Sequence, residues 1–468
     1  MGAYYTKEDI TEYISKNTII PFLFDQAQKK CKIAFEGEQS IWRLLKEDPD
    51  RYIYDAVKHG INVNIHETPP NQLDKTLPLP SKVSEGLNHV SKRTEWNKPA
   101  PPEYALPTEI WREVVARRQR CEEVRDKLSK GEIRSINDLI TYNLDIRQFA
   151  QDVIENCEGP ELLRAIYYTI AGRVPDKSNQ EFQPGMSVLD PTCGSGAFLF
   201  AALNILEPLY EACLDRMQVF LDELESSGQK HRSDKYGDFR KILERIEKHP
   251  NRRYFILKSI ILNNLFGVDI MEEATEICKL RLFLKLVAQV DSVDKIEPLP
   301  DIDFNIRAGN TLVGFAIRDE VKEAITSSEA GKLKQGKLQF GEYVETLKQL
   351  EEKAHGVEQL FNLFREQQTE LGGVVTSSDK QALINRLKEL EDDLDRYLAF
   401  EYGINQRNIS DVKEYEKRFV QWRESHQPFH WFIEFYGIMK EGGFDVIIGN
   451  PPYVEYGKIK NDYVLPIG

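Results

Sequence analysis

The sequence is poor in the residues that build metal clusters and disulfide frameworks. Its 468 residues include six cysteines, which form no Cys-x-x-Cys pair, and eight histidines without metal-ligand spacing. These patterns argue against a zinc cluster and a disulfide-stapled fold. We therefore predict no metal site and a reducing compartment.

The sequence also lacks a long hydrophobic run and an excess of basic residues. The apolar stretch 256–266 is interrupted by Lys258, Asn263 and Asn264 and is shorter than the roughly 18 residues that a membrane span needs. The N-terminus has no basic segment followed by an apolar one, so we predict a cytoplasmic protein. The net charge of -14 argues against nonspecific coating of nucleic acid, although it does not exclude a local basic cleft.

Length and composition indicate a folded protein of more than one domain. Apolar residues make up 41% and charged residues 29%, and the length exceeds what one hydrophobic core usually holds. The expected organisation is a helical N-terminal region 1–180 containing a proline-rich linker 69–107, a first α/β half 181–317, a helical insertion 318–428, and a last strand and loop 429–468. Because residue 468 follows that strand closely, we expect the sheet to be truncated.

Four short apolar segments alternate with helical patterns. Residues 187–190, 265–270, 304–307 and 444–449 are predicted strands, and helices are expected after the first two. Alternating strands and helices are typical of a parallel sheet. The predicted fold class is α/β, a Rossmann-like doubly wound sheet with a helical N-terminal region and a helical insertion.

A glycine-containing turn follows the first predicted strand. In Asp190-Pro191-Thr192-Cys193-Gly194-Ser195-Gly196, small residues join a buried strand to a helix. Such a turn allows a ligand to approach the backbone, and the helix N-terminus favours a carboxylate. The motif matches neither a triphosphate loop nor a dinucleotide loop. A plain strand-to-helix turn is the structural alternative.

Two further polar residues follow predicted strands. Asp269 ends the second strand, where a carboxylate can accept hydrogen bonds from ribose hydroxyls; a solvated residue or a helix cap is the alternative. Asn310 follows the third strand and could read an adenine edge by donating and accepting together. A turn-forming asparagine is equally compatible with this position.

The segment Asn450-Pro451-Pro452-Tyr453 directly follows the fourth strand. The prolines supply no amide donors, which leaves the Asn450 side-chain oxygen and the Pro451 carbonyl as rigid acceptors for an NH₂ group. Hydrogen bonds to both protons of an aromatic amine stabilise the tetrahedral nitrogen that forms as the amine attacks. Tyr453 provides a flat surface on which a base can stack.

Together these motifs resemble the γ-class adenine-N6 DNA methyltransferases, which use S-adenosyl-L-methionine. Gly2-Ala3-Tyr4-Tyr5-Thr6 looks like the N-terminal motif that marks this class. Many relatives have Asp where Asn310 stands. The resemblance implies that Asn450, Pro451, Pro452 and Tyr453 are catalytic. It implies cofactor contacts by Tyr5, Thr6, Asp190, Pro191, Cys193, Gly194, Gly196, Phe198, Asp269, Ile270 and Asn310.

Among such enzymes the chain looks most like the large methyltransferases of type IIG restriction-modification and BREX-like phage-defence systems. The expected partners are double-stranded DNA and restriction or phage-defence subunits. Residues 1–468 alone are expected not to methylate DNA sequence-specifically or to cleave it. The alternatives are a glutamine-amide or ribosomal-RNA amino-methyltransferase, and a non-catalytic scaffold that binds the cofactor.

Overall fold

The structure is a computed structural model that describes residues 6–61, 77–173, 183–226, 235–292, 297–333, 342–369 and 377–452. The chain forms two compact units. One unit comprises Leu23–Ala165, and the other comprises Met1–Phe22 together with Ile166–Gly468. The boundaries of the smaller unit therefore lie inside the N-terminal region 1–180 expected from the sequence.

The smaller unit is helical. Phe149 lies at its centre, stacked on Phe24 and Trp42 with ring centroids 5.8 and 5.6 Å away and met edge-on by Tyr52. Asp145 caps the helix that carries Phe149 by accepting a hydrogen bond from the Gln148 amide at 3.1 Å. The helices that lie in or enter this unit are α1 (Glu8–Lys30), α2 (Arg43–Glu47), α3 (Asp55–Lys58), α4 (Ser81–Asn88), α5 (Trp111–Lys130), α6 (Ile136–Thr141), α7 (Ile146–Glu155) and α8 (Pro160–Ala171), with short 3₁₀ turns at Lys32–Phe35, Pro49–Tyr52 and Val90–Lys92.

The region expected to be a proline-rich linker, 69–107, contains regular helix in the part that the structure describes. Helix α4 lies within it, beginning directly after Pro80, where a proline does not disturb a helix. Val83 of α4 packs in a small core with Trp96, Ala105 and Trp111. Proline density did not reveal that widely spaced apolar residues fold the stretch against α5.

The larger unit contains a parallel sheet of four strands in the order β3-β2-β1-β4. The strands are β1 (Val188–Asp190), β2 (Leu265–Asp269), β3 (Ile306–Ala308) and β4 (Val446–Ile447), which confirms the predicted strand positions. Because all four strands are parallel, their carboxyl ends meet at one edge of the sheet. Asp190, Asp269 and Ala308 lie at that edge.

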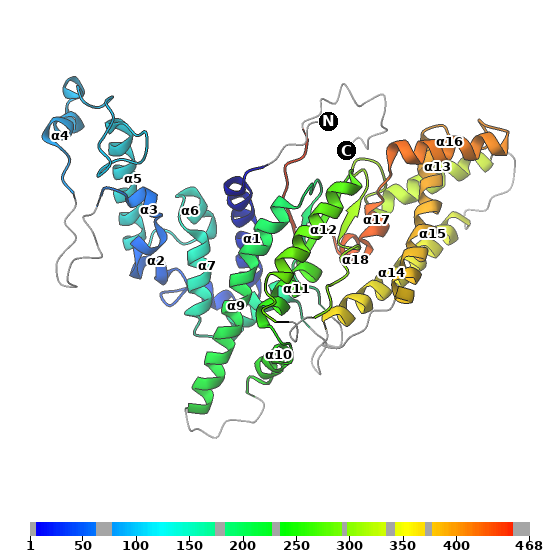
Figure 1. Cartoon of the computed structure of the whole chain (residues 1–468), viewed down its shortest axis with the longest axis horizontal. Coiled ribbons are helices and arrows are strands. Elements are labelled where there is room, and N and C mark those ends of the chain that lie inside the picture. Colours follow the sequence, from blue (N-terminus) through cyan, green and yellow to red (C-terminus); the bar gives the residue numbers. More distant parts are fainter. Residues whose placement is uncertain are drawn as a thin grey trace. The chain divides into compact units, whose positions relative to one another are not determined.

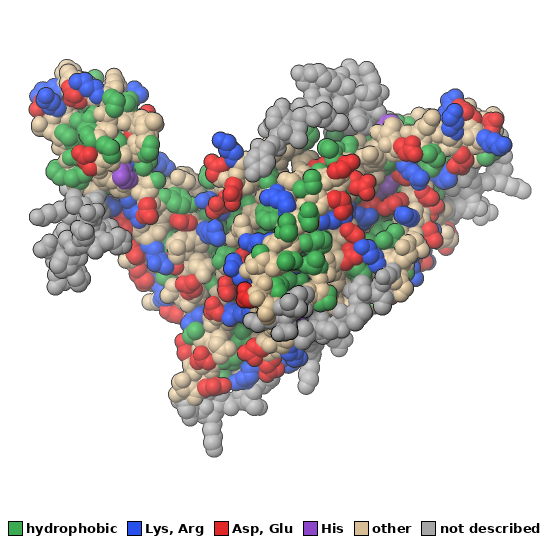
Figure 2. Space-filling view, in the orientation of Figure 1, with side chains coloured by type: hydrophobic (Ala, Val, Ile, Leu, Met, Phe, Trp, Pro, Cys, Tyr) green, Lys and Arg blue, Asp and Glu red, His purple; other side chains and the backbone are tan. Residues whose placement is uncertain are grey.

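Long helices connect the strands. They are α9 (Ala197–Ser226), α10 (Gly237–Glu247), α11 (Arg252–Asn264) and α12 (Glu272–Val287). Helix α9 is the one described helix long and apolar enough to cross a membrane, and 72% of its most apolar window is buried inside the protein. Figure 2 shows hydrophobic side chains along the outer face of α12, where Ile277, Leu280, Leu284 and Val287 are exposed.

The region predicted as a helical insertion contains long helices that follow β3 in the chain. It consists of α13 (Arg318–Leu333), α14 (Glu342–Thr369), α15 (Ser377–Glu401) and α16 (Val412–His426), and the short helices α17 (Trp431–Glu434) and α18 (Tyr436–Lys440) lead back to β4. Figure 1 shows α14 and α15 running side by side. Leu350, Leu390 and Trp422 are among the buried residues of the insertion core.

Candidate functional site at the carboxyl edge of the sheet

The glycine turn places the start of α9 beside the end of β2. Gly194 and Gly196 have φ values of +50° and +83°, in the left-handed region that favours glycine. The Cys193 amide donates to the Val268 carbonyl at 2.9 Å, which ties the turn to the neighbouring strand. The Cys193 side chain is buried, and its hydrogen bond with Cys278 raises the pKa of its thiol. Cys193 therefore contributes a buried side chain to the packing of the turn.

The two glycines allow a matched stability test. A Cβ on Gly196 would lie 2.5 Å from the Cys278 sulfur, whereas a Cβ on Gly194 would meet no atom within 4 Å. We expect Gly196→Ala to lower the free energy of unfolding by roughly 2 to 3 kcal/mol, through overpacking added to backbone strain. Gly194→Ala should cost about 1 kcal/mol. Denaturant unfolding checks this difference, and adding Cys278→Ala to Gly196→Ala should restore part of the stability.

Asp190 is a buried carboxyl group at the end of β1, with 1% of its surface exposed. Its Oδ1 accepts a hydrogen bond from the Thr192 amide at 3.1 Å. Burial, reinforced by the negative charge of Asp269, raises the pKa of Asp190 to about 7. A Cβ on Gly449 would lie 2.8 Å from Asp190 Oδ1. The end of β4 therefore passes directly beside this carboxyl group because Gly449 lacks a side chain.

Asp269 connects the glycine turn to the start of α12. Its Oδ2 accepts a hydrogen bond from the Gly194 amide at 2.9 Å, and its Oδ1 accepts one from the Met271 amide at 2.9 Å. Each carboxylate oxygen can accept a further bond, and the residue is half-buried. Asp269 is thus fixed by backbone amides and retains capacity to accept hydrogen bonds from a ligand.

Asn310 adopts the turn-forming arrangement that the sequence left open. Its Oδ1 accepts a hydrogen bond from the Leu312 amide at 3.1 Å, and its own amide donates to the Gln427 carbonyl at 2.8 Å. The side chain is buried. Its carbonyl oxygen is therefore engaged within the loop, which weakens the case for direct contact with a purine.

Thr6 of the N-terminal motif and Asn450 of the last motif meet in the structure. The Asn450 Nδ2 donates a hydrogen bond to the Thr6 hydroxyl at 3.1 Å, although the two residues are 444 positions apart. This bond uses only the Asn450 amide nitrogen, and no donor among the described residues engages the side-chain oxygen, which can accept a hydrogen bond from a ligand. Pro451 and Pro452 follow and are exposed.

The remaining predicted residues differ in their accessibility. Pro191 is half-buried between Asp190 and the glycine turn, and Ile270 is 40% exposed directly after Asp269. Phe198 is buried in α9, so its surroundings are those of a core residue. Tyr5 and Tyr453 lie outside the described residues, as do Gly2, Ala3 and Tyr4.

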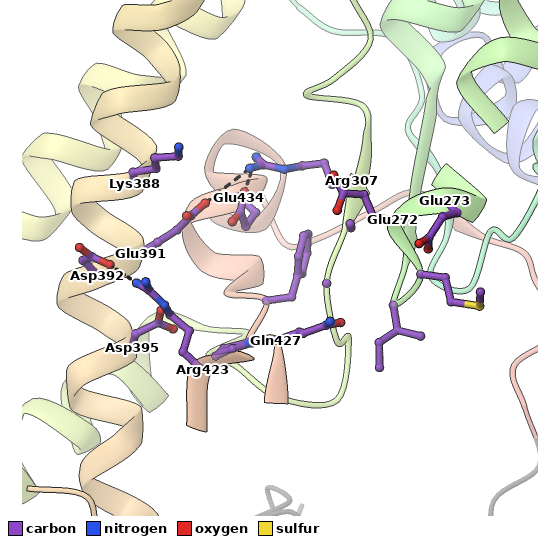
Figure 3. A pocket seen from close by; sticks show the side chains of 16 residues that line it. Glu272, Glu273, Arg307, Lys388, Glu391, Asp392, Asp395, Arg423, Gln427 and Glu434 are labelled. Carbon is purple, nitrogen blue, oxygen red and sulfur yellow. Dashed lines mark hydrogen bonds and ion pairs between the residues drawn. The ribbon is translucent and has the colours of Figure 1, made fainter. Parts of the chain in front are cut away.

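A cavity of about 780 Å³ opens beside Ile270, between the strand ends and the helical insertion (Figure 3). Arg307 on its wall forms ion pairs with Glu434 and, at 3.6 Å, with Glu391. Burial raises the pKa of Glu434 well above its usual range, and the Arg307 charge opposes that shift. The sequence did not reveal these residues because no local motif marks the side chains that the insertion contributes. The lining includes Ile270, Met271, Ala308, Gly309, Lys388, Asp392, Arg423, Gln427 and Phe429.

Within the described ranges, no group of three or more histidine, cysteine or acidic side chains could hold a metal ion. The site therefore offers carboxylates, backbone amides and one exposed asparagine amide. Such groups can bind hydroxyls, a carboxylate and an amine.

The sequence is similar to known restriction-modification proteins. Residues 263–466 match the family model described as Eco57I restriction-modification methylase. Over 307 residues the chain is 30% identical to a Methanocaldococcus jannaschii protein whose name describes a type II restriction enzyme and methyltransferase. The alignment covers 57% of this chain and 22% of that relative. No solved structure matches the chain. Both similarities are therefore to methyltransferases associated with restriction.

Proposed function

We propose that the chain transfers a methyl group from S-adenosyl-L-methionine to the N6 amine of a flipped adenine in DNA, as a cytoplasmic γ-class enzyme of a restriction-modification or phage-defence system. The observation that carries this proposal is the position of Asn450. It follows β4, next to Asp190 at the end of β1, and it holds Thr6 of the N-terminal motif. The predicted cofactor and target motifs thus share one edge of the sheet.

The strand order supports the same proposal. In the order β3-β2-β1-β4, the chain moves outward from β1 in one direction and then returns to its other side. This order matches the first four strands of a Rossmann-like doubly wound sheet, in which ligands bind outside the carboxyl ends where the order reverses. Asp190 and Asn450 both lie at that reversal, between β1 and β4.

The residues present fit the proposed cofactor. Asp269 can accept hydrogen bonds from ribose hydroxyls, and the glycine turn leaves room for a ligand near the start of α9. When bound, the cofactor supplies a methyl group activated by a sulfonium centre. In this proposal Asn450 and Pro451 accept hydrogen bonds from the target amine, orienting it for in-line attack on the methyl group.

Asp269 should contribute to cofactor affinity. We expect Asp269→Ala to weaken the binding of S-adenosyl-L-methionine by roughly 1.5 to 3 kcal/mol, because charge-assisted bonds to both ribose hydroxyls would be lost. Calorimetry measures this change. Asp269→Asn removes the negative charge but keeps one oxygen that can accept a hydrogen bond from the Gly194 or the Met271 amide. Comparing it with Asp269→Ala therefore separates the effect of the charge from the effect of a loosened glycine turn. Equal affinity in all three proteins would remove Asp269 from the site.

The substrate class can be tested with labelled cofactor. The full-length gene product would be incubated with tritiated S-adenosyl-L-methionine and equal amounts of DNA, ribosomal RNA and protein acceptors. We expect label on the N6 amine of adenine in DNA, identified after nuclease digestion. Label on guanine in RNA or on a glutamine amide would overturn the proposed substrate. Cofactor binding without transfer to any acceptor would favour the scaffold alternative.

A further inference from the structure

The cavity beside Ile270 has walls from two different layers of the larger unit. One wall consists of the ends of β2 and β3, including Ile270, Ala308 and Gly309, and the other consists of α15 and the end of α16 (Figure 3). Its volume of about 780 Å³ lies in the range of small-molecule sites. The helical insertion is thus part of the site's boundary.

The position of the cavity suits the base of a nucleoside held at Asp269. Ile270 follows Asp269 directly, and the Gly309 amide donates to the Asp269 carbonyl at 2.8 Å. Asp269 and Ala308 are register partners on adjacent strands, which lie about 4.8 Å apart in such sheets. A ribose bound at Asp269 would therefore direct its base over the apolar surface of Ile270 and the neighbouring strand end.

The insertion is held firmly against this surface. Gly309 has no room for a side chain, because a Cβ there would lie 2.6 Å from the Phe429 ring. Both ring nitrogens of His430, the next residue, form hydrogen bonds. The Nδ1 atom accepts a hydrogen bond from the Phe315 amide at 3.1 Å, and the Nε2 atom bonds the Asp395 carboxylate of α15 at 3.0 Å. Both His430 and Asp395 are buried. These contacts join the wall opposite Ile270 to the loop that follows β3.

Gln427 is the side chain best placed to read a purine edge. It caps the end of α16 with a φ of +47°, a costly conformation for a residue other than glycine. Its carbonyl accepts the Asn310 amide, and its side chain extends across the cavity toward the strand ends (Figure 3). Among the described residues no partner holds the Gln427 amide, which can both donate and accept as adenine recognition requires.

Building on the proposed function, we propose that the helical insertion completes the cofactor site and that the Gln427 side-chain amide recognises the edge of the cofactor's adenine. Gln427 would then take the role in adenine recognition that the sequence suggested for Asn310, whose backbone amide binds the Gln427 carbonyl. The selectivity of the site for adenine would then depend on Gln427, the residue that caps α16.

The test compares Gln427→Ala with Gln421→Ala, an exposed position on α16 that does not line the cavity. Calorimetry would measure the binding of S-adenosylhomocysteine and its hypoxanthine counterpart, S-inosylhomocysteine, to the full chain. We expect Gln427→Ala to weaken S-adenosylhomocysteine about 5- to 20-fold and to reduce the preference for adenine over hypoxanthine. Gln421→Ala should bind both compounds as the parent does. Gln427→Asn, which keeps an amide and tolerates positive φ, should retain more of the preference than Gln427→Ala.

The outcomes separate this inference from the proposed function. If the parent binds S-adenosylhomocysteine and Gln427→Ala keeps both its affinity and its preference, the role of Gln427 is refuted while the proposed function stands. If the parent binds neither compound, the proposed function fails, and the inference fails with it. Circular dichroism of each variant identifies a general loss of folding.

Discussion

Replacing Asn450 by alanine should lower methyl transfer by at least about 100-fold and leave cofactor affinity nearly unchanged. Asn450 is exposed beyond β4, and no donor among the described residues engages its side-chain oxygen, which can therefore accept a hydrogen bond from the target amine. That interaction strengthens as the amine nitrogen becomes tetrahedral, so its loss raises the barrier more than it weakens binding. Single-turnover methylation of DNA by the full-length gene product measures the rate, and calorimetry measures cofactor affinity.

Two further variants sharpen this test. Asn450→Asp keeps an acceptor oxygen and should retain more activity than Asn450→Ala. Asn385→Ala removes an exposed asparagine of α15 that lies outside the proposed site and should behave as the parent does. Parallel loss of cofactor binding and activity in Asn450→Ala would indicate a collapsed site and contradict a role limited to the target amine.

The sheet and its edge could be predicted because strand-forming residues and turn residues lie next to one another in the sequence. Short apolar segments, each containing at least one valine, end at Asp190, Asp269 and Gly449. Parallel pairing then brings these ends together regardless of the chain length between them. The 30% identical relative and the family match agree with the methyltransferase interpretation.

Interactions that depend on distant segments could not be predicted. The alternation of arginine and glutamate in α5 is typical of a solvated face of intrahelical pairs, yet Arg117 bonds the backbone carbonyls of His59 and Tyr104 as well as Glu109. Arg118 is buried and donates to the Gly60 carbonyl at 3.0 Å. Residue type and helical spacing do not reveal which loop will fold over a helix. The same limitation concealed Gln427, whose only local signal is its place after a predicted helix.

The charge of Asp190 carries a stability cost that depends on pH. The Asp190 carboxyl is buried at the end of β1, and its folded pKa of about 7 lies above the value near 3.8 that an unperturbed aspartate has. Between these two values the folded protein binds a proton that the unfolded chain releases. Stability contributed by the neutral carboxyl is therefore present below about pH 4 and is lost as the pH rises through about 7. A shift of roughly three pKa units corresponds to about 4 kcal/mol.

Asp190→Asn removes this titration and should therefore stabilise the protein at pH 8 by up to about 4 kcal/mol, with the advantage disappearing toward pH 4. Denaturant unfolding of parent and variant at several pH values measures the difference, and Asp222→Asn, on an exposed position of α9, is the control. A difference that does not change with pH would show that Asp190 is already charged at low pH in the folded protein. If the asparagine variant is more stable but binds S-adenosyl-L-methionine less tightly, the carboxylate is retained for the ligand at the expense of the fold, as expected of a functional residue.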